Sequence, residues 1–309
     1  MNTFSIAIHG GAGTLVKGMM IPELETQYKE ALQKSLDAGY AILENGGAAI
    51  DAVEEAVKLL EDSPLFNAGK GSVFTANETH EMDAAIMDGK TLNAGAVSLI
   101  SGIKNPVSLA KDVMEKSEHV FLAGEGAMEF ARQLKYELED DAYFYDEFRH
   151  SQWLEIKDTD SFQLDHAKQK DSKFGTVGAV ACDANGNIAA ATSTGGMTNK
   201  KWGRVGDSPM IGAGNYANNK TCAISCTGSG EFFIRGVVAY DVACLMEHKN
   251  MSLEDASNEV IYKRILEING DGGLIAVDAK GNIAMPFNTE GMYRASKSSS
   301  GTEKVSIYK

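Results

Sequence analysis

A glycine followed by a threonine, at the start of a predicted strand, is the arrangement in this chain with the clearest chemical use. Gly175 and Thr176 stand between a polar, charged segment and the small apolar run Val177–Cys182. Cleavage between them would give Thr176 a free α-amino group, which titrates near pH ~8 and can accept the proton of its own hydroxyl. A glycine before the threonine allows strained backbone that exposes its carbonyl to attack. The pair predicts a self-cleaving threonine nucleophile, and an ordinary loop entering a strand is the alternative.

A second threonine is expected beside Thr176. The run Ile188–Thr194 follows turn-forming residues 183–187, which is typical of a hairpin. Opposed side chains on one face of such a pair lie about 5 Å apart. We therefore expect the Thr194 hydroxyl to hydrogen-bond the nucleophile, although two unreactive sheet threonines would give the same pattern.

A glycine-punctuated loop carries a cation and an anion three residues apart, at Arg204 and Asp207. The planar guanidinium of Arg204 can hold a carboxylate through two parallel hydrogen bonds, and Asp207 can accept hydrogen bonds from an ammonium group. Together they suit the zwitterionic head of an amino acid. The alternative is a salt bridge between the two residues within the loop.

Glycine-containing segments offer further polar groups. Residues 227–230 (Thr-Gly-Ser-Gly) precede a predicted helix, whose first N–H groups and positive dipole end favour a negative oxygen. They predict an oxyanion hole, with a phosphate-binding loop or a plain turn as alternatives. Residues 9–13 (His-Gly-Gly-Ala-Gly) follow a strand but lack the ending of a nucleotide-binding P-loop. Asn67, in a third such segment, offers a donor and an acceptor.

The elements that must position these residues are strands in hairpins followed by helices, in each half of the chain. This order favours antiparallel sheets covered by helices, an α+β or layered α/β plan, over a doubly wound parallel sheet. We expect strands at residues 4–8, 82–87, 91–100, 176–182, 188–194, 274–278 and 283–287. We expect helices at residues 23–44, 48–60, 126–136 and 231–246, one capped by Asn105 and one by Ser252.

Residues 146–173 interrupt this order. They are polar and charged and show no lasting periodicity, which predicts a flexible, solvated linker reaching to about Gly175. A structureless segment of this length within a compact chain is unusual. It ends at the expected cleavage site.

Composition excludes several classes of function. The 309 residues, of which 43% are hydrophobic, can bury a large core, and the net charge of −14 argues against binding nucleic acid. The chain lacks a signal-type start and an apolar stretch of about 20 residues, so we expect no membrane association and a cytoplasmic location. Neither its histidines nor its four cysteines have metal-ligand spacing, and no dinucleotide fingerprint is present. We therefore expect reduced cysteines and no required cofactor.

Taken in order, these motifs resemble the plant-type asparaginase and isoaspartyl peptidase family of N-terminal-nucleophile hydrolases. The resemblance covers nearly the whole chain, and the matching segments together are far more specific than any one of them. They are residues 8–13, 65–69, 175–180, 192–196, 203–209, 227–228 and 286–293.

The resemblance implies one domain over residues 1–309 that cuts itself into an α chain, 1–175, and a β chain, 176–309. It implies hydrolysis of L-asparagine and of β-aspartyl (isoaspartyl) peptides by a threonine nucleophile. The implied roles are nucleophile for Thr176, its support for Thr194, substrate binding for Arg204, Asp207, Asn67 and Gly230, and oxyanion binding for Thr227 and Gly228.

The family fold implied is a four-layer αββα sandwich, assembled as a dimer of αβ units. The resemblance also implies a structural sodium ion in a loop of backbone carbonyls, at Leu60, Glu61, Ser63, Phe66, Ala68 and Lys70. Two positions depart from the family pattern. Ser229 replaces an expected threonine, and Lys70 brings a charge to the ion loop.

Three other interpretations remain open from sequence. A glycosylasparaginase would cut glycan from asparagine, but it works in secretory compartments, for which this chain shows no signal. A nucleotide- or phosphate-binding protein would use the glycine loops. An inert family member would fail to cleave.

Overall fold

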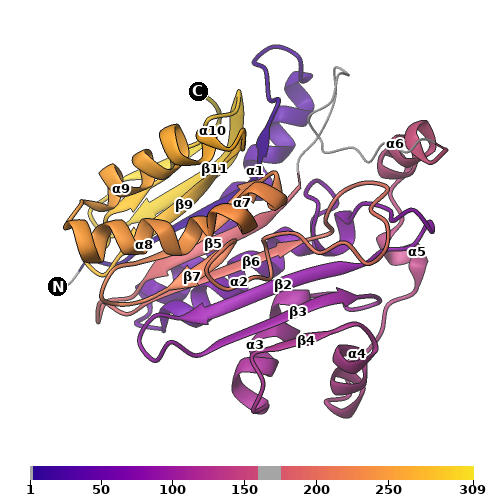
Figure 1. Ribbon diagram of the computed structural model, residues 1–309, viewed down its shortest axis with the longest axis horizontal. Coiled ribbons are helices and arrows are strands. Elements are labelled where there is room, and N and C mark those ends of the chain that lie inside the picture. The colour runs from indigo at the N-terminus through magenta and orange to yellow at the C-terminus, as the bar shows by residue number, and fades with distance from the viewer. Residues whose placement is uncertain (1–2, 159–174) are drawn as a thin grey trace.

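The computed structural model describes residues 3–158 and 175–309, and its strands form two sheets that lie face to face between layers of helices (Figure 1). In spatial order, the eight-stranded sheet contains β12 (Glu303–Tyr308), β11 (Gly291–Ser298), β1 (Ser5–Gly13), β5 (Val177–Cys182), β6 (Ile188–Thr194), β2 (Met82–Asp88), β3 (Ala94–Ile100) and β4 (Phe121–Ala123). The four-stranded sheet contains β10 (Ile283–Ala284), β9 (Gly272–Asp278), β8 (Cys222–Gly228) and β7 (Asn215–Ala217). Neighbours are antiparallel apart from the parallel pair β3 and β4. The predicted sandwich of two mainly antiparallel sheets is confirmed.

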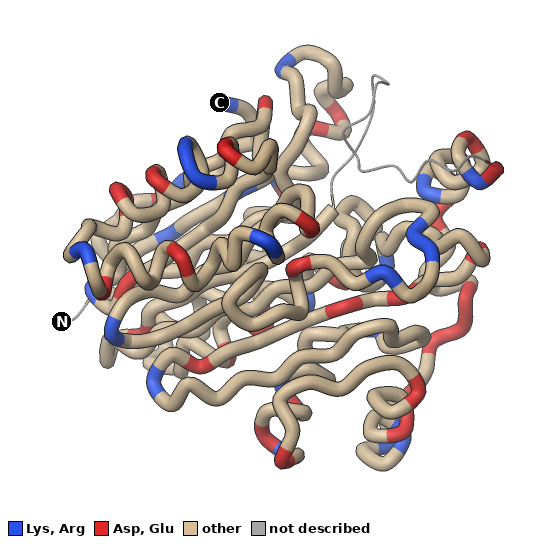
Figure 2. Tube along the Cα trace, in the orientation of Figure 1, with Lys and Arg blue, Asp and Glu red and all other residues tan. Residues whose placement is uncertain are grey.

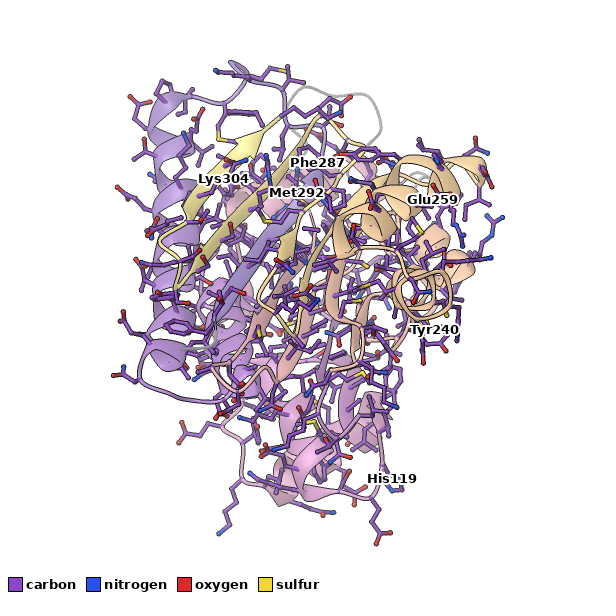
Figure 3. The ribbon with its side chains drawn as sticks, turned by 90° about the vertical axis from the view of Figure 1, so that its left-hand side faces the viewer. His119, Tyr240, Glu259, Phe287, Met292 and Lys304 are labelled. Carbon is purple, nitrogen blue, oxygen red and sulfur yellow. The ribbon has the colours of Figure 1, made fainter. Side chains whose placement is uncertain are left out.

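Helices cover the outer face of each sheet, as the edge-on view of Figure 3 shows. Those on the larger sheet are α1 (Pro22–Glu44), α2 (Ala49–Glu61) and α3 (Pro106–Lys116), with α4 (Gly124–Gln133) near its edge. Those associated with the smaller sheet are α7 (Gly230–Gly236), α8 (Val238–Lys249), α9 (Leu253–Glu259), the π-helical turn η2 (Val260–Arg264) and α10 (Ile265–Glu267). The short elements η1 (Gly69–Gly71), α5 (Asp141–Phe144) and α6 (Glu147–Ile156) lie in the connections.

Alternating side chains along the strands fill three apolar layers. On β1, Ile6 packs beneath the helices of the larger sheet, whereas Ala7 packs between the sheets. On β9, Leu274 packs beneath the helices of the smaller sheet, whereas Ile275 packs between the sheets. Because side chains alternate with a period of two, β1 and β9 each contribute to two layers and are buried on both faces.

Residues 9–13 form no loop, contrary to expectation. They continue β1 to Gly13 and pair with β11, with a bulge between His9 and Gly11. A glycine-rich segment shows no apolar alternation, so the sequence pattern concealed the strand. The consequence is that His9 lies inside the larger sheet.

The helix expected over residues 231–246 is interrupted. Val237 adopts left-handed backbone angles, φ 46° and ψ 46°, and separates α7 from α8. Residue propensities do not predict this break, because valine disfavours left-handed backbone angles. The break makes α7 a separate, short helix that follows residues 227–229.

Part of the linker expected at 146–175 is helical. Residues 147–156 form α6, whose first turn is capped because the Asp146 side chain accepts a hydrogen bond from the Arg149 backbone N–H at 2.9 Å. Trp153 of α6 is buried, its ring centroid 6.3 Å from that of Phe74. A tertiary contact therefore stabilises a helix without amphipathic periodicity, and residues 159–174 lie outside the described part of the chain.

The first turn of α3 is capped by a side chain of another helix, α2. Asn105 occupies the expected N-cap position, but its side chain makes no capping bond and instead donates to Asp62 at 3.1 Å. The Glu61 carboxyl accepts the hydrogen bond from the Val107 backbone N–H at 3.0 Å. This buried carboxyl joins the end of α2 to the start of α3.

Charge and hydropathy can be followed along the described residues. Lys and Arg are scattered among acidic residues over 3–158 and 175–309 (Figure 2). In these same ranges, no helix is both long and apolar enough to cross a membrane.

Candidate active site

Thr176 immediately precedes β5 and lies on the inner face of the larger sheet, toward the smaller one. The pairing of Val177 with Ser193 in β5 and β6 brings Thr194 beside it. The Thr176 hydroxyl donates to Thr194 Oγ1 at 3.3 Å and lies 3.5 Å from Ser208 Oγ. The hydroxyl contact expected from the hairpin is therefore present, and Thr176 is buried.

The carbonyl oxygen of Gly175 faces two hydrogen-bond donors. The Thr194 hydroxyl donates to it at 2.6 Å, and Asn67 Nδ2 donates at 3.4 Å. Because the Thr194 proton points to Gly175, its oxygen lone pairs can accept from Thr176 and from the Gly196 N–H, which is 3.0 Å away. Two donors aimed at one carbonyl oxygen polarise it for attack.

Asn67 is held so that its amide points at this carbonyl. Its Oδ1 accepts the Val73 N–H at 3.0 Å, while its Nδ2 also donates to the Gly196 carbonyl at 2.7 Å. A Cβ at Gly195 would overlap Asn67 Oδ1, so a glycine there makes room for the amide. The expected position of Asn67 near Thr176 agrees with the structure.

Arg204 and Asp207 line the same region without forming a pair. The Arg204 guanidinium makes two hydrogen bonds to Glu231, at 2.9 and 3.0 Å, and no ion pair among the described residues joins it to Asp207. The alternative of a salt bridge within the loop is therefore wrong. Asp207 is buried, its Oδ2 has no hydrogen-bond partner, and burial raises its pKa to about 7.

Gly230 packs against both groups. A Cβ at Gly230 would lie 2.9 Å from Asp207 Oδ1 and 3.0 Å from Arg204 Nη2. The segment that begins α7 therefore shares one space with the cation and anion of the loop. The unpaired Asp207 oxygen suits an ammonium group. Glu231 occupies Nε and Nη2 of Arg204, so Nη1 is the part of the guanidinium left to bind a ligand carboxylate.

Thr227 and Gly228 end β8, next to Gly230. The Thr227 hydroxyl accepts a hydrogen bond from the Ala12 N–H at 3.3 Å, and no hydrogen bond within the described residues joins it to Thr176. Gly228 has φ 147° and packs against residues 271–272. The structure thus fixes this segment through its neighbours, and the described hydrogen bonds of Thr227 do not reach Thr176.

The glycines of the loop after α2 pack closely against backbone carbonyls. A Cβ at Gly69, where φ is 53°, would overlap the Glu61 carbonyl oxygen, and one at Gly71 would overlap that of Phe66. The described residues contain no cluster of three His, Cys, Asp or Glu that could hold a metal. Lys70 Nζ lies over the Tyr143 ring, 5.1 Å from its centroid. These residues fit a monovalent cation bound by backbone oxygens.

Sequence reasoning missed several side chains around the site. Ser208 lies within the matching segment 203–209 but was given no role, and Glu231 directly follows Gly230, so extending that motif by one residue would have found it. Asp83 lies opposite Thr194 in the sheet and is fully buried with one unpaired oxygen. Buried Lys200, which donates to the Glu81 carbonyl at 2.6 Å, has no sequence signal.

Comparison with known proteins identifies relatives over the whole chain. Residues 2–307 match the asparaginase family. The chain is 51% identical over 307 residues to an isoaspartyl peptidase of Escherichia coli, covering 98% of this chain and 96% of the relative. It is 50% identical over 312 residues to an isoaspartyl peptidase of Salmonella typhimurium, covering 100% of each. It is 45% identical over 299 residues to a plant-type L-asparaginase of Thermococcus kodakarensis, covering 93% and 94%. The resemblance inferred from the motifs is confirmed, and the chain belongs to the asparaginase family.

Proposed function

We propose that this enzyme cuts itself between Gly175 and Thr176 and then hydrolyses L-asparagine and β-aspartyl peptides with Thr176 as nucleophile. The observation that carries the proposal is the Gly175 carbonyl held by Thr194 and Asn67, with the Thr176 hydroxyl bonded to Thr194. The names of the relatives, isoaspartyl peptidase and L-asparaginase, support the substrate class.

Self-cleavage begins when Thr176 Oγ1 attacks the Gly175 carbonyl carbon. The hydroxyl proton moves to Thr194, whose own proton moves to the developing oxyanion, so charge never accumulates on the carbonyl oxygen. The C–N bond then breaks, the proton passes to the Thr176 nitrogen, and an ester joins the two residues. Water hydrolyses the ester, which leaves a carboxylate on Gly175 and a free amine and hydroxyl on Thr176.

Turnover repeats this chemistry on the substrate. The α-carboxylate binds Arg204 and the α-ammonium binds Asp207, which fixes the side-chain carbonyl toward Thr176. The Thr176 amine takes the hydroxyl proton as the hydroxyl attacks, and backbone groups at Thr227 and Gly228 stabilise the oxyanion. Ammonia or an amino acid leaves with the proton, and water releases aspartate from the ester.

The test is replacement of Thr176 by alanine. Thr176→Ala should remain one chain of 33.1 kDa on a denaturing gel and lose turnover of asparagine and β-aspartyl-leucine. The unaltered protein should yield a fragment whose N-terminal residue is Thr176. A fully active, unbroken wild-type chain would disprove the proposal, and faster release from a glycosylated asparagine would favour a glycosylasparaginase.

We also propose a bound ion, a cellular location and an assembly for this enzyme. Residues of the loop after α2 would hold a structural sodium ion through backbone carbonyls, and catalysis would require no cofactor. The free cysteines support a reducing, cytoplasmic location. On the family resemblance, two cut chains would assemble as a dimer of αβ units.

A further inference from the structure

The segment that ends β8 is held by Asp271, the residue that precedes β9. The Ser229 hydroxyl donates to Asp271 Oδ1, and the Ser229 backbone N–H donates to the Asp271 carbonyl oxygen at 3.1 Å. Ser229 is buried and directly follows Thr227 and Gly228, whose backbone groups would stabilise the oxyanion of the proposed reaction. The mechanism described above assigns no role to Ser229 or to Asp271.

Gly228 touches the backbone beside Asp271 directly. It lies opposite Gly272 in the pairing of β8 with β9, and the two glycines have φ 147° and φ 146°. A Cβ at Gly228 would overlap the Asp271 carbonyl oxygen, and it would lie 2.7 Å from Gly272 Cα. Glycine allows such a close approach of two backbones. The position of Asp271 therefore sets the position of Gly228.

A single amide fixes the backbone on both sides of Asp271. Asn288 Oδ1 accepts the Gly272 N–H at 2.8 Å, and Asn288 Nδ2 donates to the Gly270 carbonyl at 3.3 Å. The Asn288 backbone N–H also donates to the Gly272 carbonyl at 2.9 Å. Asn288 belongs to the motif 286–293, whose role the sequence does not reveal. These bonds hold Asp271 in place.

The other end of the segment has an anchor of its own. Glu231, two residues after Ser229, accepts two hydrogen bonds from the Arg204 guanidinium, at 2.9 and 3.0 Å. Gly230 lies between the two anchors. Asp271 therefore acts on the side of the residues proposed to bind the oxyanion, whereas Arg204 acts on the side proposed to bind the α-carboxylate of the substrate.

We propose that Ser229 and Asp271 are positioning residues, and that the bond between them holds the backbone groups of Thr227 and Gly228 where the oxyanion forms. A donor stabilises this charge only when it lies about 2.7–3.1 Å from the oxygen of the transition state. A small displacement would therefore lower kcat more than it weakens substrate binding. The inference rests on the proposed function, because it concerns the oxyanion site of the same reaction.

Self-cleavage distinguishes positioning from a general loss of structure. The Gly175 carbonyl is held by Thr194 and Asn67, so the proposed cleavage does not need the oxyanion segment 227–228. We expect Ser229→Ala to cut itself at the rate of the unaltered protein but to lose about 10- to 100-fold in kcat for L-asparagine. Its inhibition constant for L-aspartate should change little, because binding of the product creates no oxyanion. Denaturing gels and steady-state kinetics would measure these quantities.

Conservative variants test the bond from both of its ends. Ser229→Thr keeps the hydroxyl and should retain most of kcat. Asp271→Asn keeps an oxygen that can accept the hydrogen bond, so it should retain more of kcat than Asp271→Ala. Ser252→Ala is the matched control, because Ser252 Oγ donates to Asp255 Oδ2 at 2.7 Å at the start of α9, and it should leave kcat unchanged.

A parallel fall in the self-cleavage rate and the kcat of Ser229→Ala would show a structural role and overturn the inference. Equal kcat values within either pair, Ser229→Thr with Ser229→Ala or Asp271→Asn with Asp271→Ala, would overturn it as well. Absence of a fragment starting at Thr176 in the unaltered protein would instead remove the proposed function, whatever the variants show.

Discussion

At the scale of single residues, Thr194 has two hydrogen-bond partners, which matter at successive stages of the proposed mechanism. Its proton points at the Gly175 carbonyl, and its oxygen accepts the proton of Thr176. A hydroxyl can do both because it is one donor and two acceptors. The proposed cleavage would free the Gly175 carbonyl from Thr176, and it would leave the Thr194 hydroxyl to the proposed nucleophile.

Removal of that hydroxyl should slow self-cleavage. In Thr194→Val the Gly175 carbonyl keeps only the longer bond from Asn67, so we expect cleavage to slow by about 100-fold. Time-resolved denaturing gels of fresh precursor would measure it. Ser193→Ala is the matched control, because Ser193 lies on the opposite face of β6 and should leave the rate unchanged. Cleavage of Thr194→Val at the wild-type rate would contradict the relay.

Asp207 should make ligand binding depend on pH. Burial raises its pKa to about 7, so its carboxyl is neutral below that pH and loses its attraction for an ammonium group. Between pH 5 and 7 the inhibition constant of L-aspartate should rise about tenfold for each unit of decrease, because the Thr176 amine stays protonated there. Competitive inhibition assays would measure this, and Asp207→Asn should give a flat profile. A flat profile in the unaltered enzyme would exclude Asp207 as the ammonium site.

Gly230 should tolerate no side chain. Since a Cβ there would lie within 3.0 Å of both Arg204 and Asp207, we expect Gly230→Ala to raise KM for asparagine at least tenfold. Steady-state kinetics would show it. Gly126→Ala, where a Cβ meets open space, is the control and should match the unaltered enzyme. Equal KM values for both variants would show that Gly230 does not shape the pocket.

At the scale of elements, sequence periodicity predicted what local rules determine. Helix α1 and the hairpin of β5 and β6 follow from apolar spacing and turn residues, and the contact of Thr176 with Thr194 follows from that hairpin. Helix α6 could not be predicted, because its Trp153 packs against the ring of Phe74, a residue distant in sequence. Ser225 reaches His9 from another sheet, 216 positions away, and no local pattern encodes such a contact.

A substitution at the break between α7 and α8 should stabilise the folded protein. Val237 is half exposed and sits in a left-handed conformation that costs a branched residue about 1–2 kcal/mol. Val237→Gly should relieve this and, after the entropy of the freer unfolded chain, raise Tm by about 2 °C. Calorimetry would test it, with Val238→Gly, inside the helix and buried, expected to lower Tm. A lower Tm in Val237→Gly would mean that the valine packs favourably.

At the scale of the whole molecule, the two segments that the proposed cleavage would separate share one sheet. Strand β1 belongs to the segment before the cut and lies between β11 and β5, which follow it. Likewise β6, from after the cut, pairs with β2, from before it. The fragments should therefore co-elute in native size-exclusion chromatography and separate only in denaturant. Their separation under native conditions would show that the sheet does not hold them together.

The Gly175 carbonyl meets Asn67 and Thr194 only when the central strands have assembled, because these donors come from distant parts of the chain. Catalytic activity would therefore indicate that the polypeptide has completed its folding. On the proposed mechanism, a copy that has not completed its sheet could not generate the terminal amine and would stay inactive. Active hydrolase would then come only from molecules whose central strands have assembled.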